Sequence, residues 1–519
     1  MEQSLNRWGF ADDKLADFID GLLIPKLFMA MRTLGKRAGN QSIGNQFSEA
    51  VGQLNATART ELARLIVGRD WGSIDGNSIV PNAKGLFLFE RSNNLAMVIS
   101  YSPMLRKAND LFFGDSAAIF EHDAAGHELH IDRTLNVEGS GFQHQRYFAD
   151  LDGVIIRIFD TGDFSRQPHY IVDMGCGDGS LLRSVYLTIR DRTKRGQVLS
   201  KYPVTLIGID LNPKALVATE TTLNGLPHCL FEGDINKPDH VLCRLEALNI
   251  GRDEVLHIRT FIDHDRRYQS PVDQARAAQR NTPQDGGGIY AERNGQLAPW
   301  AVAYQALVEH FSRWTKIIGR HGLLLFEVHS LPSSIVCQYI DECENLHFDA
   351  FHAYSGQQLF YAKDFLMAVG EVGLLPNFST TRRYPRTLPY TRIVLHWLAP
   401  RTFTIRTALD RDIDALIDLE MRLWPTRDKG ELQTETIDRV RLFSDYYYVA
   451  ECDGRVLGAM YTLPLSSHAR FDNLTYRDLD NIRDQSGDTL MFVSLSIDPD
   501  AASLGLASEL RDFVLLKTI

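Results

Sequence analysis

Residues 171–180, IVDMGCGDGS, decide the fold of this chain. They run from a short apolar segment through a glycine-rich turn into the segment LLRSVYLTIRD, whose apolar residues recur at helical spacing. Glycines in such a turn admit positive φ angles and let backbone amides approach a ligand closely. The stretch predicts a buried strand, a turn and a helix in direct succession, and the turn is either a ligand site or a tight connection.

The same alternation continues downstream. Strand-like runs (VTLIGID, CLFEGDI, VLHIRTFID, LLLFEVH, FSTTRRYP and TRIVLHWLAP) are separated by helix-like runs. This pattern is typical of an α/β fold with a doubly wound, mainly parallel sheet, which we place at residues 148–400. Apolar residues recur at helical spacing from Asp12 to about Trp71, residues 72–83 are turn-rich, and a mixed helical region follows to about Gly141. Residues 1–147 are therefore expected to form a helical N-terminal lid subdomain. The glycine-rich residues 266–295 are too long for an ordinary connection and are expected to form a lid or insertion.

Carboxylates mark the ends of the first predicted strands. Asp210 ends the second strand and can accept both hydroxyls of a ribose, and Asp234, after the third, can accept an adenine amino group. The glycines read G-C-G-D-G rather than G-x-G-x-x-G, which argues against a dinucleotide. The arrangement resembles that of class I S-adenosylmethionine methyltransferases, whose ligand has no pyrophosphate. The predicted cofactor-binding residues are Asp173, Gly175, Gly177, Asp210, Leu211, Asp234 and Ile235.

Polar side chains gather at the ends of the next two strands, where chemistry occurs in a doubly wound sheet. Asp263 and His264 end the fourth strand, and His329 ends the fifth. The following segment adds further imidazoles and amides: His347, His352, Gln357 and Gln358. Each histidine alone could be an ordinary polar residue at a strand end, but the set suits a divalent metal ion.

Together these motifs carry a family resemblance. NVEGSGFQHQRYF, VDMGCGDGS, FIDHDRRY, GLLLFEVHSL and HAYSGQ resemble the C-methyltransferases that open certain modular polyketide synthases. The C-terminal part is similar to the GNAT-like (GCN5-related acetyltransferase) domain that follows them in loading modules of the apratoxin and gephyronic acid type. The resemblance to this methyltransferase and pseudo-GNAT pair covers nearly the whole chain.

The resemblance implies a substrate and a second cofactor. The substrate would be a malonyl or methylmalonyl group on the phosphopantetheine of an acyl carrier protein, with downstream polyketide synthase domains as partners. The family also uses one mononuclear metal ion, iron or manganese, and we carry its ligation onto His329, Gln357 and His264, with Asp263 and His352 in reserve. A metal chelating the malonyl group stabilises the enolate as a Lewis acid. His264 and His329 are the predicted catalytic residues.

Residues 401–519 are expected to form a partial α+β GNAT-like domain. The Asp453–Gly454 pair between two strand-like runs predicts a hairpin. At residues 501–507, AASLGLA, the final G-x-A of the GNAT loop is present, but Ala502 replaces its Gln or Arg. We expect no acetyltransferase activity and a structural or docking role.

Composition limits the remaining alternatives. A net charge of −11 makes nucleic acid and anionic membranes unlikely partners. Six scattered cysteines and the lack of a signal-like or spanning segment favour a soluble cytoplasmic protein. Two other functions stay open: a metal-independent O- or N-methyltransferase of a small metabolite, and a catalytically dead scaffold for a carrier protein.

Overall fold

The structure is a computed structural model that describes residues 13–35, 42–123, 128–283, 286–339, 342, 346 and 348–518. The chain divides into two compact units, residues 1–149 and 150–519. Helix α9, Arg133–Phe159, runs across this division. Among the described residues, no helix combines the length and apolarity needed to cross a membrane.

The first unit is mainly helical, as the sequence predicts, but it also contains a two-stranded hairpin. Gly76, with φ of +59°, turns β1 into β2 within a segment that reads only as turn-rich in the sequence. Asparagine or serine side chains cap several of its helices, as where Asn55 accepts a hydrogen bond from the amide of Ala58 at 2.8 Å. Its longer elements are α2 (Asp13–Gly35), α3 (Ile43–Gly52), α4 (Ala56–Gly68), β1 (Gly72–Asp75), β2 (Ser78–Pro81) and α5 (Ala83–Arg91).

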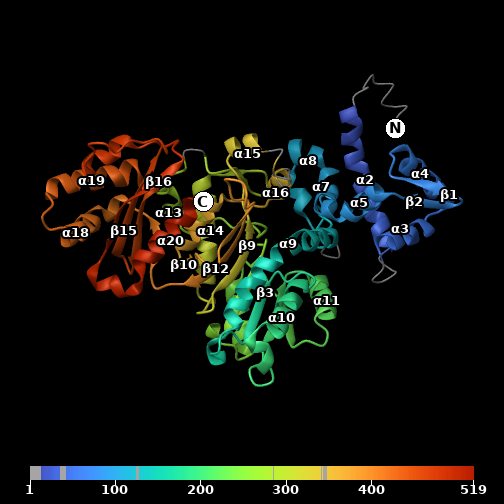
Figure 1. Cartoon of the computed structure of the whole chain (residues 1–519), viewed down its shortest axis with the longest axis horizontal. Coiled ribbons are helices and arrows are strands. Elements are labelled where there is room, and N and C mark those ends of the chain that lie inside the picture. Colours follow the sequence, from blue (N-terminus) through green and yellow to red (C-terminus); the bar gives the residue numbers. More distant parts are fainter. Residues whose placement is uncertain are drawn as a thin grey trace. The chain divides into compact units, whose positions relative to one another are not determined.

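A mixed eight-stranded sheet is the centre of the second unit, in the order β10-β12-β9-β6-β3-β4-β5 with β11 paired to β12. Figure 1 labels β3, β9, β10 and β12 of this sheet. The five strands from β9 to β5 are parallel, and β10, β11 and β12 form the antiparallel edge. This confirms the doubly wound α/β sheet. Its strands are β3 (Tyr170–Met174), β4 (Thr205–Asp210), β5 (His228–Glu232), β6 (Val255–Thr260), β9 (Leu323–Val328), β10 (Leu374–Pro376), β11 (Arg382–Tyr384) and β12 (Ile393–Pro400).

Helices connect these strands and bury their apolar faces against the sheet. Helix α14, with Leu307, Phe311 and Trp314 fully buried, packs into the main core. The helices of this region are α10 (Ser180–Arg192), α11 (Pro213–Thr222), α12 (Pro238–Ala247), α13 (Gln274–Ala278), α14 (Trp300–Trp314), α15 (Ser333–Tyr339), α16 (Phe348–Tyr354) and α17 (Ala362–Gly370).

The glycine-rich segment 266–295 is anchored at several points. It contains α13, and its strand β7 (Tyr290–Ala291) pairs with β8 (Leu297–Ala298). Tyr290 is buried and stacks on Phe360 with ring centroids 4.6 Å apart. The segment is therefore an insertion with structure of its own, and its expected action as a lid stays a prediction.

Residues 401–518 contain a separate four-stranded antiparallel sheet, in the order β13-β14-β15-β16. Asp453 and Gly454 both have positive φ and join β14 to β15, which confirms the predicted hairpin. Its elements are β13 (Thr404–Thr407), α18 (Ile413–Leu423), α19 (Lys429–Leu442), β14 (Tyr447–Cys452), β15 (Arg455–Leu465), β16 (Thr489–Ile497) and α20 (Leu506–Thr518).

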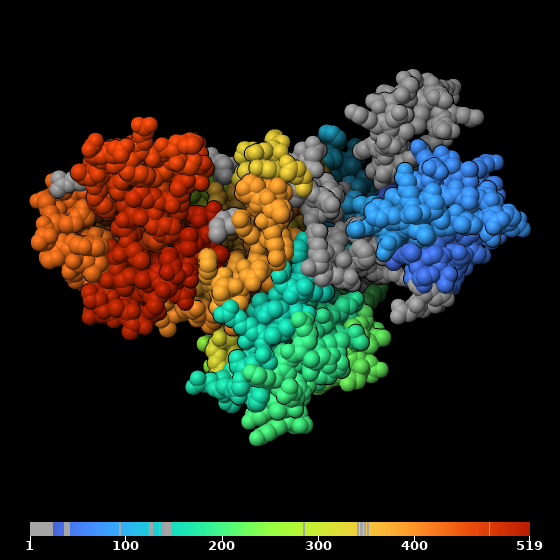
Figure 2. Space-filling model, viewed as in Figure 1, coloured from blue at the N-terminus to red at the C-terminus, as the bar shows by residue number. Residues whose placement is uncertain are grey.

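This C-terminal part shares a hydrophobic core with the first sheet of the second unit. Phe513 of α20 lies so close to α17 that a Cβ on Gly370 would come within 2.5 Å of its ring. Leu510 and Phe513 belong to the same buried cluster as Leu366 and Leu374. The space-filling view shows the red surface of this part beside the yellow and orange surface that precedes it (Figure 2).

Candidate active site

The glycine-rich turn is held by the neighbouring strand β4. The amides of Gly175 and Cys176 donate to the Ile209 carbonyl at 2.7 and 3.1 Å, and the Gly177 amide donates to Asp210 Oδ2 at 3.0 Å. Gly175 has a φ of +82°, and a Cβ there would lie 2.4 Å from the Ile262 side chain. The backbone conformation therefore favours glycine at this position, and a larger residue would also have to displace the end of the Ile262 side chain.

Asp210 has a structural role that the sequence does not reveal. Besides the Gly177 amide, its carboxylate accepts the Asn212 amide at 2.8 Å, so it fastens the turn after β3 to the turn after β4. The strand-end carboxylate of Asp210 therefore packs between the two turns as well as having a predicted place in the cofactor site. A carboxylate offers about four acceptor sites, so these bonds and a ribose contact are compatible.

Asp173 is the most buried acid of this region, with 1% of its surface exposed. Burial first, and then the nearby Asp210 carboxylate, raise the pKa of Asp173 to about 8. Its Oδ1 has no hydrogen-bond partner in the described chain. A cationic ligand group would compensate this carboxylate, and the α-ammonium or sulfonium of S-adenosylmethionine is such a group.

The remaining predicted cofactor residues differ in exposure. Leu211 follows Asp210 and is 62% exposed, which leaves it available to an adenine ring. Asp234 follows β5, and its Oδ1 accepts the Asn236 amide at 2.9 Å. Ile235 is buried in the main core, and its carbonyl accepts a hydrogen bond from Trp314. Their contacts with cofactor stay predictions.

The ends of β6 and β9 meet in a buried polar cluster. His264 Nδ1 lies 2.5 Å from Glu327 Oε1, and the His264 amide donates to the second oxygen of the same carboxylate at 3.2 Å. Burial alone would lower the pKa of His264, but Glu327 raises it above its ordinary value. Glu327 thus fixes the imidazole so that Nε2 is its remaining ring nitrogen.

Asp263 points away from this pair and belongs to a second buried group. Its Oδ1 accepts hydrogen bonds from Arg259 Nη1 and His310 Nε2, both at 2.9 Å. Burial would raise the pKa of Asp263, but Arg259 and then His310 bring it to about 2. These partners occupy Oδ1, whereas Oδ2 has no hydrogen-bond partner among the described residues, so the place of Asp263 as a reserve metal ligand stays a prediction.

His329 is 1% exposed, and its ring lies edge-on to Phe365 with centroids 5.2 Å apart. Burial first, and then His396, hold the pKa of His329 well below its usual range, while the Phe360 backbone offsets this in part. Neither ring nitrogen has a well-formed hydrogen bond among the described residues. A neutral, buried imidazole with a free ring nitrogen is able to bind a metal ion.

Residues of α16 and of the segment that follows it lie next to His264. The Gln358 amide donates to the His264 carbonyl at 2.9 Å, and the His352 ring lies 5.3 Å from the His264 ring. Gln357 is half-buried and follows α16. His347, also singled out in the sequence, lies outside the described residues.

A metal ion fits the chemistry of these donors but not a conventional ligand count. In the described part of the chain, no three His, Cys, Asp or Glu side chains are grouped to hold a metal ion. The expected set contains two such residues, His264 and His329, and needs an amide oxygen from Gln357 as its third ligand. The Glu327 contact to His264 is the kind of second partner that orients metal-bound histidines.

Glu327, Arg259 and His310 belong to these buried groups, and the sequence analysis does not single them out. A signal was present for two of them, because Glu327 and Arg259 are single charges inside apolar strands. Charged residues are almost never fully buried unless they are paired, so each charge implies a partner. Which partner each one has depends on the register of β6 with β9 and on α14.

Comparison with known proteins agrees with this geometry. Residues 128–396, just over half of the chain, match the family model described as the AprA MT2-like domain. The chain belongs to the AprA MT2-like methyltransferase family. It is a methyltransferase that depends on S-adenosylmethionine. Residues 20–115 match the AprA winged helix domain, which accounts for the β1–β2 hairpin within the predicted helical N-terminal subdomain.

Solved structures show weaker likenesses. An O-methyltransferase family protein from Burkholderia thailandensis is 11% identical and covers 74% of this chain and 98% of its own, with a TM-score of 0.39. CalO1, a methyltransferase in calicheamicin biosynthesis with S-adenosylhomocysteine bound, is 13% identical over 77% and 98%, with a TM-score of 0.36. The loading GNATL domain of CurA from Lyngbya majuscula is 22% identical and covers 22% of this chain, with a TM-score of 0.20. The chain spans 57% of that structure. No curated protein matches.

Proposed function

We propose that this AprA MT2-like methyltransferase methylates the α-carbon of a malonyl or methylmalonyl group carried by an acyl carrier protein. The observation that carries the proposal is the buried cluster at the ends of β6 and β9, where His264, Glu327 and His329 gather. In a doubly wound sheet this edge also receives the cofactor. A polar, buried site beside the methyl donor suits a substrate that must be enolised before it reacts.

The metal belongs to this proposal. His329 and His264 would hold an iron or manganese ion through ring nitrogens, with the Gln357 amide oxygen as third ligand. A bound ion would supply Lewis acidity to the malonyl carboxylate and thioester carbonyl. Three protein ligands leave open positions for such a chelating group.

The chain's own residues would do the rest of the work. Glu327 holds the His264 ring in one orientation through Nδ1, so Nε2 is presented to the site. Asp210 and the glycine turn position the cofactor. Their combined task is to keep the α-carbon in line with the sulfonium methyl, since alignment alone supplies a large part of the barrier reduction.

A second candidate is a metal-independent O- or N-methyltransferase of a small metabolite. It is favoured by the His264–Glu327 pair, because an imidazole held by a carboxylate at 2.5 Å is also the arrangement of a general base. In that case His264 Nε2 would take the proton of a hydroxyl or amine, and His329 would be a buried strand-end histidine.

Two variants separate the candidates. The purified protein is analysed for metal and incubated with malonyl carrier protein and S-adenosylmethionine, and the acyl mass is read. The first proposal expects bound iron or manganese in the wild type. It also expects His329→Ala to lose both metal and about 100-fold or more in methyl transfer. His240, an exposed histidine of α12, gives the matched control His240→Ala.

The opposite result favours the second candidate. A metal-free wild type with His329→Ala fully active and Glu327→Gln strongly impaired would identify base catalysis. Binding of S-adenosylmethionine is measured in every variant, because both candidates expect it to be kept when the cofactor end is untouched. A wild type that binds the cofactor but methylates no acyl carrier substrate would overturn the first proposal.

A further inference from the structure

A cavity of about 640 Å³ lies where the methyltransferase region meets the C-terminal part. Its walls come from α13, α14 and α17 on one side and from β13, α19 and α20 on the other. None of the residues assigned to the cofactor or to the buried cluster of β6 and β9 lines it. It is therefore a separate site within the second unit.

The walls of this cavity are rich in cations. Four carboxylates line it, on Asp364, Glu371, Asp410 and Asp445. They are outnumbered by the basic side chains, which are those of Arg276, Arg280, Lys363, Arg406, Arg411, Arg441 and Lys517. The chain as a whole carries a net charge of −11, so this local excess of positive charge does not follow from the overall composition.

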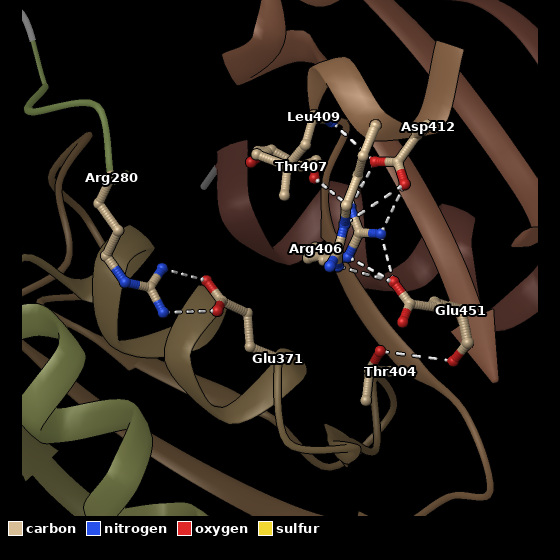
Figure 3. A network of polar contacts seen from close by, with 9 residues as sticks. Arg280, Glu371, Thr404, Arg406, Thr407, Leu409, Asp412 and Glu451 are labelled. Atoms are coloured by element: carbon tan, nitrogen blue, oxygen red, sulfur yellow. Dashed lines mark hydrogen bonds and ion pairs between the residues drawn. The ribbon is translucent and has the colours of Figure 1, made fainter. Parts of the chain in front are cut away.

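Two of the arginines are fully committed to structure (Figure 3). Arg280 makes a bidentate pair with Glu371, at 2.9 and 2.8 Å, and its guanidinium lies 4.5 Å from the centre of the Tyr304 ring. Arg406, on the opposite wall, pairs with both oxygens of Asp412 and with Glu451. These ion pairs hold the two walls in place, and they leave neither guanidinium with a side-by-side pair of free N–H donors for a ligand.

Arg276 has no such partner. Its side chain is half-buried on α13 and forms no hydrogen bond or ion pair within the described chain. Burial, followed by the positive charges of Arg280, Arg411 and Arg406, lowers the pKa of Arg276, and Glu371 opposes this only in part. A guanidinium stays charged in proteins, so this repulsion persists unless an anion joins the group.

A second cation on the opposite wall is also without an ion pair. Lys517 Nζ donates to the Asp445 carbonyl at 2.9 Å and to the Tyr448 hydroxyl at 3.0 Å, both neutral oxygens. No carboxylate of the described chain lies within ion-pair distance of it. Burial lowers the pKa of Lys517, but Tyr448 and then Asp445 and Asp364 raise it above its ordinary value, so the ammonium stays charged. Arg276 and Lys517 therefore place two cations without a salt-bridge partner among the described residues on the two walls of one cavity.

We propose that this cavity binds a phosphate-bearing ligand, with the Arg276 guanidinium and the Lys517 ammonium as its principal contacts. A guanidinium fork matches two phosphate oxygens, and lysine adds a point charge. The volume exceeds that of a phosphate alone and suits an organic phosphate of cofactor size. Tyr446, which also lines the cavity, offers an aromatic surface to the rest of the ligand. The proposal does not depend on the methylated substrate.

Calorimetric titration of the full chain with inorganic pyrophosphate, at constant ionic strength, tests the site. Saturable binding is expected in the wild type, and Arg276→Gln is expected to weaken it by about 10- to 100-fold, because one charge-assisted contact is lost. Lys517→Gln is also expected to weaken pyrophosphate binding, because it removes a charged contact from the opposite wall. Arg470 is an exposed arginine of the same part that does not line the cavity, and Arg470→Gln is the matched control.

Two further measurements keep the result interpretable. S-adenosylmethionine binding reports folding, and it should be equal in all variants. Phosphopantetheine and ADP are then compared with pyrophosphate, and the tighter of them identifies the organic body that the cavity prefers. Absence of saturable binding in the wild type, or equal affinity in Arg276→Gln and the control, would overturn the proposal.

Discussion

The two halves of the parallel sheet's carboxyl edge differ in how their sites are built. At β3 and β4 the site is made of backbone, with the glycine turn hydrogen-bonded to the end of the neighbouring strand. At β6 and β9 it is made of buried side chains that pair across strands, as His264 does with Glu327. The first kind centres on ten consecutive residues, whose turn is fastened to a strand end 33 positions after Gly177, whereas the second pairs side chains 63 positions apart.

This difference explains which residues could be assigned in advance. A glycine turn after a strand has few possible geometries, so Gly175 and Gly177 could be located from the sequence. In the second half, adjacent residues take unrelated roles. Asp263 turns toward Arg259 and His310, while His264, the next residue, turns toward Glu327.

The largest expected effect comes from a substitution in the buried side-chain network at the ends of β6 and β9. Asp263→Ala leaves Arg259 and His310 buried without their shared carboxylate, so we expect a loss of about 3–5 kcal/mol in the free energy of unfolding. Denaturant unfolding measures it. Glu246→Ala, at an exposed acid of α12, should change the unfolding free energy by less than about 0.5 kcal/mol. Equal stability of the two variants would contradict the buried network.

The next effect concerns the glycine turn after β3 and the end of β4. Asp210→Ala should weaken S-adenosylmethionine binding by about 100-fold or more, since charge-assisted hydrogen bonds to the cofactor are lost. It should also cost about 1 kcal/mol of stability, because the amides of Gly177 and Asn212 lose their acceptor. Calorimetry measures the loss of cofactor affinity, and thermal unfolding measures the loss of stability. Wild-type affinity in Asp210→Ala would remove this residue from the cofactor site.

The effect that is small within any single pH unit is a pH dependence at Asp173. Its folded pKa of about 8 lies above the ordinary value of 3.8, so between these limits the folded chain binds one proton more than the unfolded chain. Unfolding free energy is therefore expected to fall as pH rises through this interval, by ~1.4 kcal/mol per pH unit from this group.

Asp173→Asn should remove that slope, because an amide carries no titrating proton. Stability curves of the two proteins from pH 5 to 8, without cofactor, make the comparison. In the wild type, affinity for the cationic cofactor should rise with pH as the carboxylate ionises. Parallel stability curves would show that Asp173 is already ionised in the folded chain.

Much of the fold follows from the sequence because its signals are local. The apolar runs before Gly175 and at residues 323–328 predict strands, and the Asp453–Gly454 pair predicts the hairpin that joins β14 to β15. Strand β10 was missed, because its three residues, LLP, are too few to show a period. The hairpin of β1 and β2 was read as a turn-rich segment for the same reason.

The sequence by itself determined the α/β sheet, the glycine turn and the carboxylate positions, because strand period and turn chemistry are properties of neighbouring residues. Only the tertiary structure decided which buried charge meets which partner. It paired Glu327 with His264 and Asp263 with Arg259, and it left Arg276 facing other arginines. These choices follow from strand register and helix packing, which bring together groups whose distance along the chain carries no information about their distance in space.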